Sequence, residues 1–147
     1  MLGAVERKIE QFIVELGDKE VSVLYAKLPA GKRLRAKLIL KIAGSHLAAV
    51  KTAAVVEMIH AASLLHDDVI DDAYTRRSKP SLNALYGNKT AIMLGDILYS
   101  KGFLELNNIS TDIAKIISQA VVQLSLGELA DVSLSKTFNV DKDSYLK

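Results

Sequence analysis

Residues 52–72 read TAAVVEMIHAASLLHDDVIDD, and this stretch decides the fold class. As far as Leu65 it is apolar on nearly every side, and then it becomes acidic. A helix that is apolar all round is normally surrounded by other helices. Alanine, leucine, methionine and glutamate favour a helix, and the stretch is too long for an ordinary strand. We therefore predict a central helix from Thr52 to Asp72.

Helical spacing of apolar residues recurs on both sides of this stretch. The segments that show it are Val5–Leu16 (ended by Gly17), Leu34–Gly44, 91–106 and 113–134. Three polar segments are expected to be turns or loops: Pro29–Gly31, Ala73–Ser81 and 135–145, where Asp141 could cap a further helix. The pattern predicts an all-α helical bundle. We expect residues 1–147 to belong to one domain, without a second.

Composition excludes several classes of protein. The 147 residues are 50% hydrophobic and contain no cysteine, which excludes intrinsic disorder, disulfide scaffolds and thiolate metal sites. A formal net charge of +2 is too small to favour nucleic acid. We find no run of about 18 uncharged apolar residues and no signal peptide at the start. We therefore expect a cytoplasmic protein without a transmembrane segment.

The acidic end of the central helix, HDDVIDD at residues 66–72, is the first functional signal. Residues four apart on a helix lie side by side, so Asp67 should pair with Asp71 and Asp68 with Asp72. The helix dipole opposes carboxylates at a C-terminus, which favours a compensating cation over a solvated acidic end. Mg²⁺ typically takes one or two protein carboxylates together with substrate phosphates. This cluster is a candidate Mg²⁺ site.

Two basic clusters complement these acids. Lys32 and Arg35 stand at the start of the second predicted helix, where free backbone N–H groups attract anions. Arg76 and Arg77 follow the acidic cluster in the predicted loop, and arginine side chains suit phosphate oxygens. Each cluster alone is more often solvated surface. Together, acids for a metal and bases for phosphate suggest a metal-bridged diphosphate.

Two histidines lie on the central helix. His60 precedes Asp67 by seven residues and shares its face, so a polar cavity is about as plausible there as a satisfied core histidine. His66 is expected to pack beside the loop, without a functional role.

The segments GKRLR, IHAASLLHDDVIDD and RRSKPSLNALYGNKTAIMLGDILYS occur in this order along the chain. In order and spacing the chain resembles the first half of a trans-isoprenyl diphosphate synthase, a member of the polyprenyl synthetase family. The resemblance covers residues 29–146 and implies an isoprenoid-synthase-type helical bundle, here about half of it. Ala30 and Ala36 stand where the family motif commonly has glycine and proline. The family's second aspartate-rich motif does not occur in this chain.

The resemblance implies a role for each matching residue. Asp67 and Asp71 would bind two or three Mg²⁺ ions that hold an allylic diphosphate, with Asp68 beside them as part of the catalytic motif. The residues that would bind diphosphate are Lys32, Arg35, His60 and Arg77 for isopentenyl diphosphate, and Arg76 for the allylic substrate. The reaction would be chain elongation by prenyl transfer.

Product length and assembly also follow from the resemblance. The small side chains of Ala62 and Ser63, just before the acidic cluster, imply geranylgeranyl or longer products, because bulky residues there would stop the chain early. A homodimer is expected. The alternative is a half-length, non-catalytic subunit or fragment that binds diphosphate without turnover. A metal-dependent phosphohydrolase, suggested by the His66–Asp67 pair, would need further metal ligands that the sequence does not offer.

Overall fold

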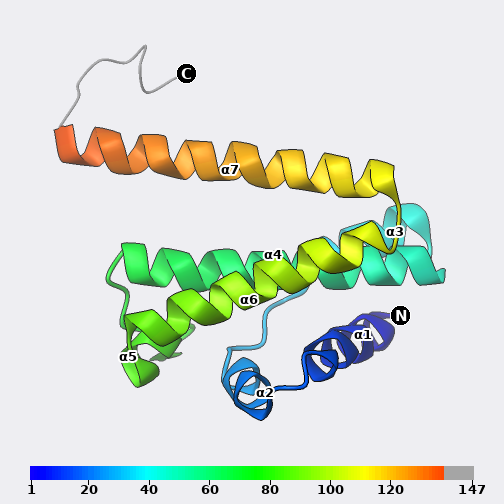
Figure 1. Cartoon of the computed structure of the whole chain (residues 1–147), viewed down its shortest axis with the longest axis horizontal. Helices are drawn as coiled ribbons and strands as arrows, with labels where there is room; N and C mark the ends of the chain where they lie inside the picture. Colours follow the sequence, from blue (N-terminus) through cyan, green and yellow to red (C-terminus); the bar gives the residue numbers. More distant parts are fainter. Residues whose placement is uncertain (138–147) are drawn as a thin grey trace. The chain divides into compact units, whose positions relative to one another are not determined.

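The structure is a computed structural model that describes residues 1–137, and these residues are almost entirely helical (Figure 1). The elements are α1 (Leu2–Glu15), α2 (Lys19–Ala26), α3 (Leu34–Ala43), α4 (Leu47–Ile70), β1 (Thr75–Arg76), β2 (Lys79–Pro80), α5 (Leu82–Tyr86), α6 (Asn88–Asn107) and α7 (Thr111–Thr137). The predicted all-α class is confirmed. The described residues divide into two units, one of residues 1–110 and one that begins at Thr111. Every predicted site residue lies in the first unit, and the expectation of a single domain stays a prediction.

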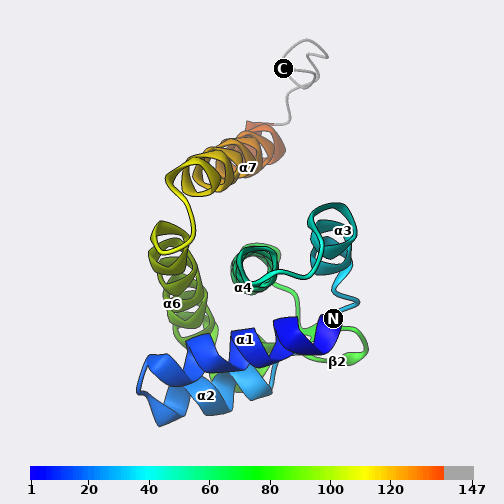
Figure 2. The same ribbon diagram turned by 90° about the vertical axis from the view of Figure 1, so that its right-hand side faces the viewer.

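Helix α4 is the centre of the first unit, as predicted. Figure 2 shows it nearly end-on, with α1, α3 and α6 packed around it. Its side chains Val55, Met58 and Ala62 are fully buried. The helix begins at Leu47 and not at Thr52, because the His46 side chain caps it by accepting the N–H of Ala49 at 3.3 Å.

Helices α4 and α6 approach each other closely at two glycines of α6. A Cβ atom on Gly95 would lie 2.5 Å from the His66 ring, and one on Gly102 would lie 3.2 Å from the Ile59 side chain. The α6 side chains Leu94 and Leu98 fill the same interface and are buried. The absence of a side chain at both glycines therefore sets the distance between the two helices.

The C-terminus of α4 has the Schellman geometry. The N–H of Ala73 donates to the carbonyl of Asp68 at 2.8 Å, and the N–H of Asp72 donates to the carbonyl of Val69 at 3.3 Å. Asp72 has a φ of 52°, a left-handed conformation that aspartate tolerates better than most residues. The helix thus ends at Ile70, and the predicted helical pairing of Asp68 with Asp72 is wrong.

The predicted loop Ala73–Ser81 contains a small antiparallel hairpin, in which Thr75 pairs with Pro80 and Arg76 with Lys79. Arg77 and Ser78 form its two-residue turn, with φ values of 51° and 64°. Positive φ at both turn residues matches the right-handed twist of the strands, and Asn-Gly is the usual sequence for it. The hairpin was not predicted because Arg-Ser lacks that signal.

Two short helices were also missed, although each has a recognisable cap. Asp18 accepts the N–H of Val21 at 3.1 Å and begins α2, while Ser81 accepts the N–H of Ala84 at 3.3 Å and begins α5. Both helices are short, so their apolar periodicity is weak. Helix α7 continues to Thr137, into the segment predicted as a polar loop, and Asp141 lies outside the described residues.

A buried ion network joins α1 to α6. The Lys101 ammonium donates to Glu15 at 2.9 Å and to Glu105 at 2.7 Å. Burial lowers the pKa of Lys101, but the hydrogen bonds that it donates to the two carboxylates outweigh this effect and raise the pKa overall. The network keeps the charge of Lys101 balanced inside the unit.

Within the part of the chain that the structure describes, length and hydropathy alone would allow two helices to cross a membrane, Leu47–Ile70 and Thr111–Leu134. No transmembrane segment was expected, because the sequence has no uninterrupted run of about 18 uncharged apolar residues. Half of the most apolar 18-residue segment of the first helix is buried within the protein, as in the core helix of a globular domain. The test is weak for both segments, because core helices satisfy it as readily as membrane spans do.

Candidate functional site

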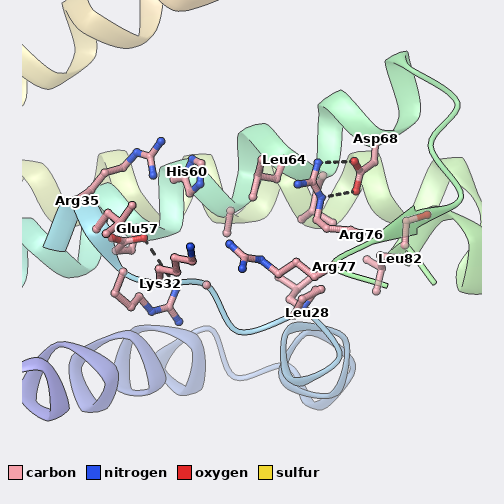
Figure 3. Close-up of a pocket in the computed structure, with 17 residues that line it drawn as sticks. Leu28, Lys32, Arg35, Glu57, His60, Leu64, Asp68, Arg76, Arg77 and Leu82 are labelled. Atoms are coloured by element: carbon pink, nitrogen blue, oxygen red, sulfur yellow. Dashed lines mark hydrogen bonds and ion pairs between the residues drawn. The ribbon is translucent and has the colours of Figure 1, made fainter. Parts of the chain in front are cut away.

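A cavity of about 120 Å³ lies along one face of α4, between the segment that leads into α3 and the β1–β2 hairpin (Figure 3). Its lining includes six basic residues: Lys32, Arg33, Arg35, His60, Arg76 and Arg77. Only two acidic side chains line it, Glu57 and Asp68. We call this cavity the basic pocket. All five residues that the sequence analysis assigned to diphosphate binding line it.

The α4 face of the pocket carries Glu57, His60, Leu64 and Asp68. These positions follow helical spacing, so their side chains share one side of the helix. The sequence analysis placed His60 on the face of Asp67, but the carboxylate that lines the pocket beside it is that of Asp68. Asp67 is not among the lining residues.

Glu57 is buried, with 3% of its surface exposed, and was not singled out as a functional residue. Its carboxylate accepts the backbone N–H of Ala36 at 2.9 Å, in the first turn of α3. This helix lacks a cap from its own N-cap side chain, so Glu57 satisfies an N–H that the helix leaves unpaired. The bond requires a residue other than proline at position 36, since proline has no N–H.

Arg33 faces Glu57 and belongs to the scaffold of the pocket. Its guanidinium lies 3.9 Å from the Glu57 carboxylate and donates to Glu6 of α1 from two nitrogens. The hydrogen bond to Glu6 raises the pKa of Arg33. Burial raises the pKa of the neighbouring Tyr25 hydroxyl, against the opposing effect of Arg33. Arg33 is therefore held from several sides.

Asp68 holds Arg76 at the other end of the pocket. The two nitrogens Nε and Nη2 of Arg76 donate to the two carboxylate oxygens of Asp68 at 2.9 and 2.6 Å, and Figure 3 shows the fork. Asp68 is buried, with 6% of its surface exposed, and this hydrogen bonding raises the pKa of Arg76. Two nitrogens of Arg76 therefore bind Asp68 in this structure, and the expected contact of Arg76 with the allylic diphosphate stays a prediction.

Three other basic residues of the pocket are exposed. In the part of the chain that the structure describes, no ion pair or side-chain hydrogen bond engages Lys32, Arg35 or Arg77. We call these the three unpaired basic residues. Burial lowers the pKa of His60, and the positive charge of Arg35 lowers it further. The pocket therefore carries an uncompensated positive field, which is the electrostatic requirement for binding an anion.

The carboxylates of Asp67 and Asp71 lie outside the pocket lining. Asp67 is half-buried on α4, and Asp71 is the exposed C-cap residue one turn later, with its N–H donating to the carbonyl of Asp67. Among residues 1–137, no group of three or more side chains is placed to hold a metal. Two carboxylates on adjacent turns nevertheless fit a cation that keeps most of its ligands from water and phosphate.

His66 contacts α6 and not the loop, so the expected position was wrong. Its Nε2 atom lies 3.1 Å from the carbonyl oxygen of Ile92 and 3.2 Å from the Asp96 carboxylate. Its ring meets Tyr99 edge-on, with the centroids 5.5 Å apart. This position is available because Gly95 has no side chain.

Ala62 and Ser63, the residues expected to set product length, lie elsewhere on α4. Ala62 is fully buried near α6, and the Ser63 hydroxyl donates to the carbonyl of His60 at 2.6 Å. Neither residue lines the basic pocket.

Known proteins similar to this chain were found by sequence and by structure. The polyprenyl synthetase family profile matches residues 20–147. Solanesyl-diphosphate synthase 2, chloroplastic, of Oryza sativa subsp. japonica is 36% identical over 127 residues, which cover 79% of this chain and 32% of the rice protein. The match by sequence includes the α3 start, α4 and the hairpin, which together build the pocket.

Solved structures agree with this relationship. The octaprenyl pyrophosphate synthase of Helicobacter pylori superposes with a TM-score of 0.91 and 44% identity, covering 99% of this chain and 50% of that one. The polyprenyl synthase of Caulobacter crescentus CB15, solved in complex with calcium and isoprenyl diphosphate, gives 0.84 and 30%, covering 99% and 46%. This chain spans half or less of the length of these three proteins. Its sequence and its helical fold show that it belongs to the polyprenyl synthetase family.

Proposed function

We propose that this chain is the diphosphate-binding half of a prenyltransferase that condenses an allylic diphosphate with isopentenyl diphosphate. The observation that carries the proposal is the basic pocket, in which the three unpaired basic residues line one cavity together with His60. Lysine and arginine donate charge-assisted hydrogen bonds to phosphate oxygens. Family membership supports the reaction class, since the similar proteins are named as prenyl diphosphate synthases.

The residues divide between two diphosphates in this proposal. Lys32, Arg35, His60 and Arg77 bind isopentenyl diphosphate, and Asp67 and Asp71 hold the allylic diphosphate through Mg²⁺. Bound Mg²⁺ would neutralise charge on the departing diphosphate. Positive charge on a side chain that is already in position stabilises a leaving group without reorganisation. Arg76 keeps its place beside Asp68 and adds positive charge on the side of the acidic cluster.

Binding of inorganic pyrophosphate and isopentenyl diphosphate to the 147-residue protein, measured by calorimetry, tests the pocket. We expect binding of both, weakened at least several-fold by Arg77→Ala and by Lys32→Ala. Arg7→Ala is the matched control, because Arg7 is an exposed arginine of α1 outside the basic pocket. No binding, or equal losses in all three variants, would contradict the proposal.

Turnover is a separate question, because the chain spans half or less of its relatives. We expect the 147 residues alone to make no prenyl product from Mg²⁺, farnesyl diphosphate and labelled isopentenyl diphosphate. Charge on a departing diphosphate must be neutralised from more than one side, and each preorganised donor is worth about 10²–10³ in rate. Elongated product from a pure sample would overturn this expectation. Substrate binding without product also fits the alternative of a non-catalytic half-length subunit, which a partner chain would activate.

Product length belongs to the same proposal. We propose geranylgeranyl or longer products, set in part by Ala62 and Ser63. In a full-length enzyme Ala62→Phe should shorten the product, because the added volume has to occupy space near α6. An unchanged product distribution would mean that the tail follows another path. We further propose a cytoplasmic homodimer, which cell fractionation and sedimentation of the natural protein would test.

A further inference from the structure

We propose that Glu57 and Asp68 are positioning residues of the basic pocket. Each of these two buried carboxylates holds one arginine in place, and the unpaired basic residues beside that arginine are thereby presented to the diphosphate. The inference rests on the proposed function, because it concerns how the same pocket is kept in shape. It assigns Glu57 a role and gives Asp68 a role other than metal binding.

Glu57 controls the end of the pocket formed by α3. Its carboxylate accepts the N–H of Ala36 and faces the guanidinium of Arg33, so it fixes both the first turn of α3 and the residue before it. Arg33 has a φ of 55°, a left-handed backbone that a non-glycine residue adopts only when its surroundings enforce it. Lys32 and Arg35 flank these two contacts directly in sequence. Their positions therefore depend on Glu57.

Asp68 controls the end formed by the hairpin. The fork to Arg76 fastens β1 to α4, and Ser81 supports the hairpin from its far end by donating to the carbonyl of Ala73 at 2.8 Å. Arg77 is the next residue, at the turn, and it too has a left-handed φ, of 51°. Without Asp68 the guanidinium of Arg76 would lose its only carboxylate within hydrogen-bonding distance among residues 1–137.

The two ends of the pocket thus share one arrangement. Glu57 and Asp68 are eleven residues apart on α4, which is close to three full turns, so both project from the same side. At each end an arginine lies against a buried carboxylate, Arg33 at 3.9 Å from Glu57 and Arg76 in the forked hydrogen bond to Asp68. A neighbouring basic residue at each end is unpaired among residues 1–137. A purely solvated basic surface would not require either carboxylate to be buried.

Whether the variants bind an anion more tightly or more weakly distinguishes a positioning role from a simple effect of charge. Glu57→Gln and Asp68→Asn each remove a negative charge from the pocket wall, so Coulomb attraction alone would make an anion bind more tightly. Loss of positioning would make it bind more weakly. For supporting residues that orient a binding group, the usual loss is about tenfold or more.

The experiment is calorimetric titration of the 147-residue protein with inorganic pyrophosphate in the presence of EDTA, so that no metal contributes. We expect Glu57→Gln and Asp68→Asn to weaken binding about tenfold. Asp68→Glu, which keeps a carboxylate, should recover part of the loss. Two controls should stay within about twofold of the wild type. Glu20→Gln makes the same charge change at an exposed position of α2 outside the basic pocket, and Glu105→Gln alters a buried carboxylate of the α1–α6 network.

Thermal unfolding of every variant shows whether it is folded. Should Glu57→Gln not fold, Glu6→Gln removes the other partner of Arg33 from a more exposed position and should weaken pyrophosphate in the same direction. The NMR signal of His60 is a second readout: pyrophosphate should raise the pKa of His60 in the wild type and raise it less in folded Glu57→Gln.

The outcomes separate the two proposals. If the wild type does not bind pyrophosphate, the proposed function fails. If the wild type binds and the Glu57 and Asp68 variants bind equally well or more tightly, the pocket stands and the positioning inference is wrong. A loss in Asp68→Asn that appears only when Mg²⁺ is added would make Asp68 a metal ligand and would also overturn the inference.

Discussion

Two groups of carboxylates, on α4 and at its C-cap, differ in burial and in the residues that they contact. Glu57 and Asp68 are buried on the pocket side, and each contacts an arginine. Asp67 and Asp71 are more exposed, and in the described residues neither takes part in an ion pair. Asp67 and Asp68 are adjacent in sequence, yet a helix turns about 100° per residue, so they face different surroundings. The acidic motif therefore combines a buried carboxylate that pairs with Arg76 and two more exposed carboxylates, for which we propose different roles.

The largest expected effect tests the exposed pair. Asp67→Asn and Asp71→Asn should each remove most of the gain in pyrophosphate affinity that Mg²⁺ provides, about a hundredfold, because a hard cation loses a charged oxygen ligand. Without Mg²⁺ both variants should bind pyrophosphate like the wild type. Titrations with and without Mg²⁺ measure the difference. A comparable loss of pyrophosphate affinity with and without Mg²⁺ would mean that Asp67 and Asp71 do not act through the metal.

The free energy of unfolding should depend on the buried carboxylates and hardly on the exposed pair. Asp68→Asn leaves the Arg76 guanidinium without its buried partner and should lower the free energy of unfolding by about 2 kcal/mol, a value reduced from that of a fully buried pair because Arg76 is partly exposed. Asp67→Asn should change it by no more than about 0.5 kcal/mol. Urea unfolding of the two variants provides the measurement. Equal values would mean that burial does not distinguish these aspartates.

The pKa of His60 depends on the positive charge around the basic pocket. Burial, with the charge of Arg35, lowers its pKa, so the folded state resists protonation more than the unfolded chain does. The His60 contribution to stability is therefore complete above the ordinary histidine pKa of about 6.5 and falls as the pH drops below it. Arg35→Gln should raise the pKa of His60 in an NMR titration. An unchanged pKa of His60 in that variant would contradict the influence of Arg35.

The smallest effect concerns the hairpin that brings Arg76 to Asp68. Ser78 has a φ of 64°, so Ser78→Gly should relieve backbone strain and raise the free energy of unfolding by about 1 kcal/mol. The same substitution at Ser100, an exposed position within α6, should lower it by about 1 kcal/mol, because glycine disfavours a helix. Chemical denaturation compares them. Destabilisation by both variants would argue against the left-handed turn.

Local patterns were enough to predict the longer helices and five of the six basic residues that line the pocket. Val5, Ile9 and Phe12 repeat at helical spacing and are buried where that spacing requires. The apolar composition of the stretch up to Leu65 predicted a central helix, because each of its faces needs a covering neighbour. Residue chemistry and motif order indicated that Lys32 and Arg35 would meet the arginine pair, and they line one pocket with it. Periodicity and residue type are properties of neighbours in the chain, so the sequence states them directly.

The packing of segments that are distant in sequence determines which charged side chains pair with each other. Arg33 is held while Lys32 remains unpaired among the described residues, because a carboxylate 24 positions later and another on α1 meet only the former. The same packing buries Asp68 and leaves Asp67 more open, and it made Glu57 a cap for a helix that precedes it in the chain. A short motif contains no information on which of its charges will be desolvated. That depends on the approach of α3 and the hairpin to α4, and burial then makes pairing obligatory for the charges it encloses.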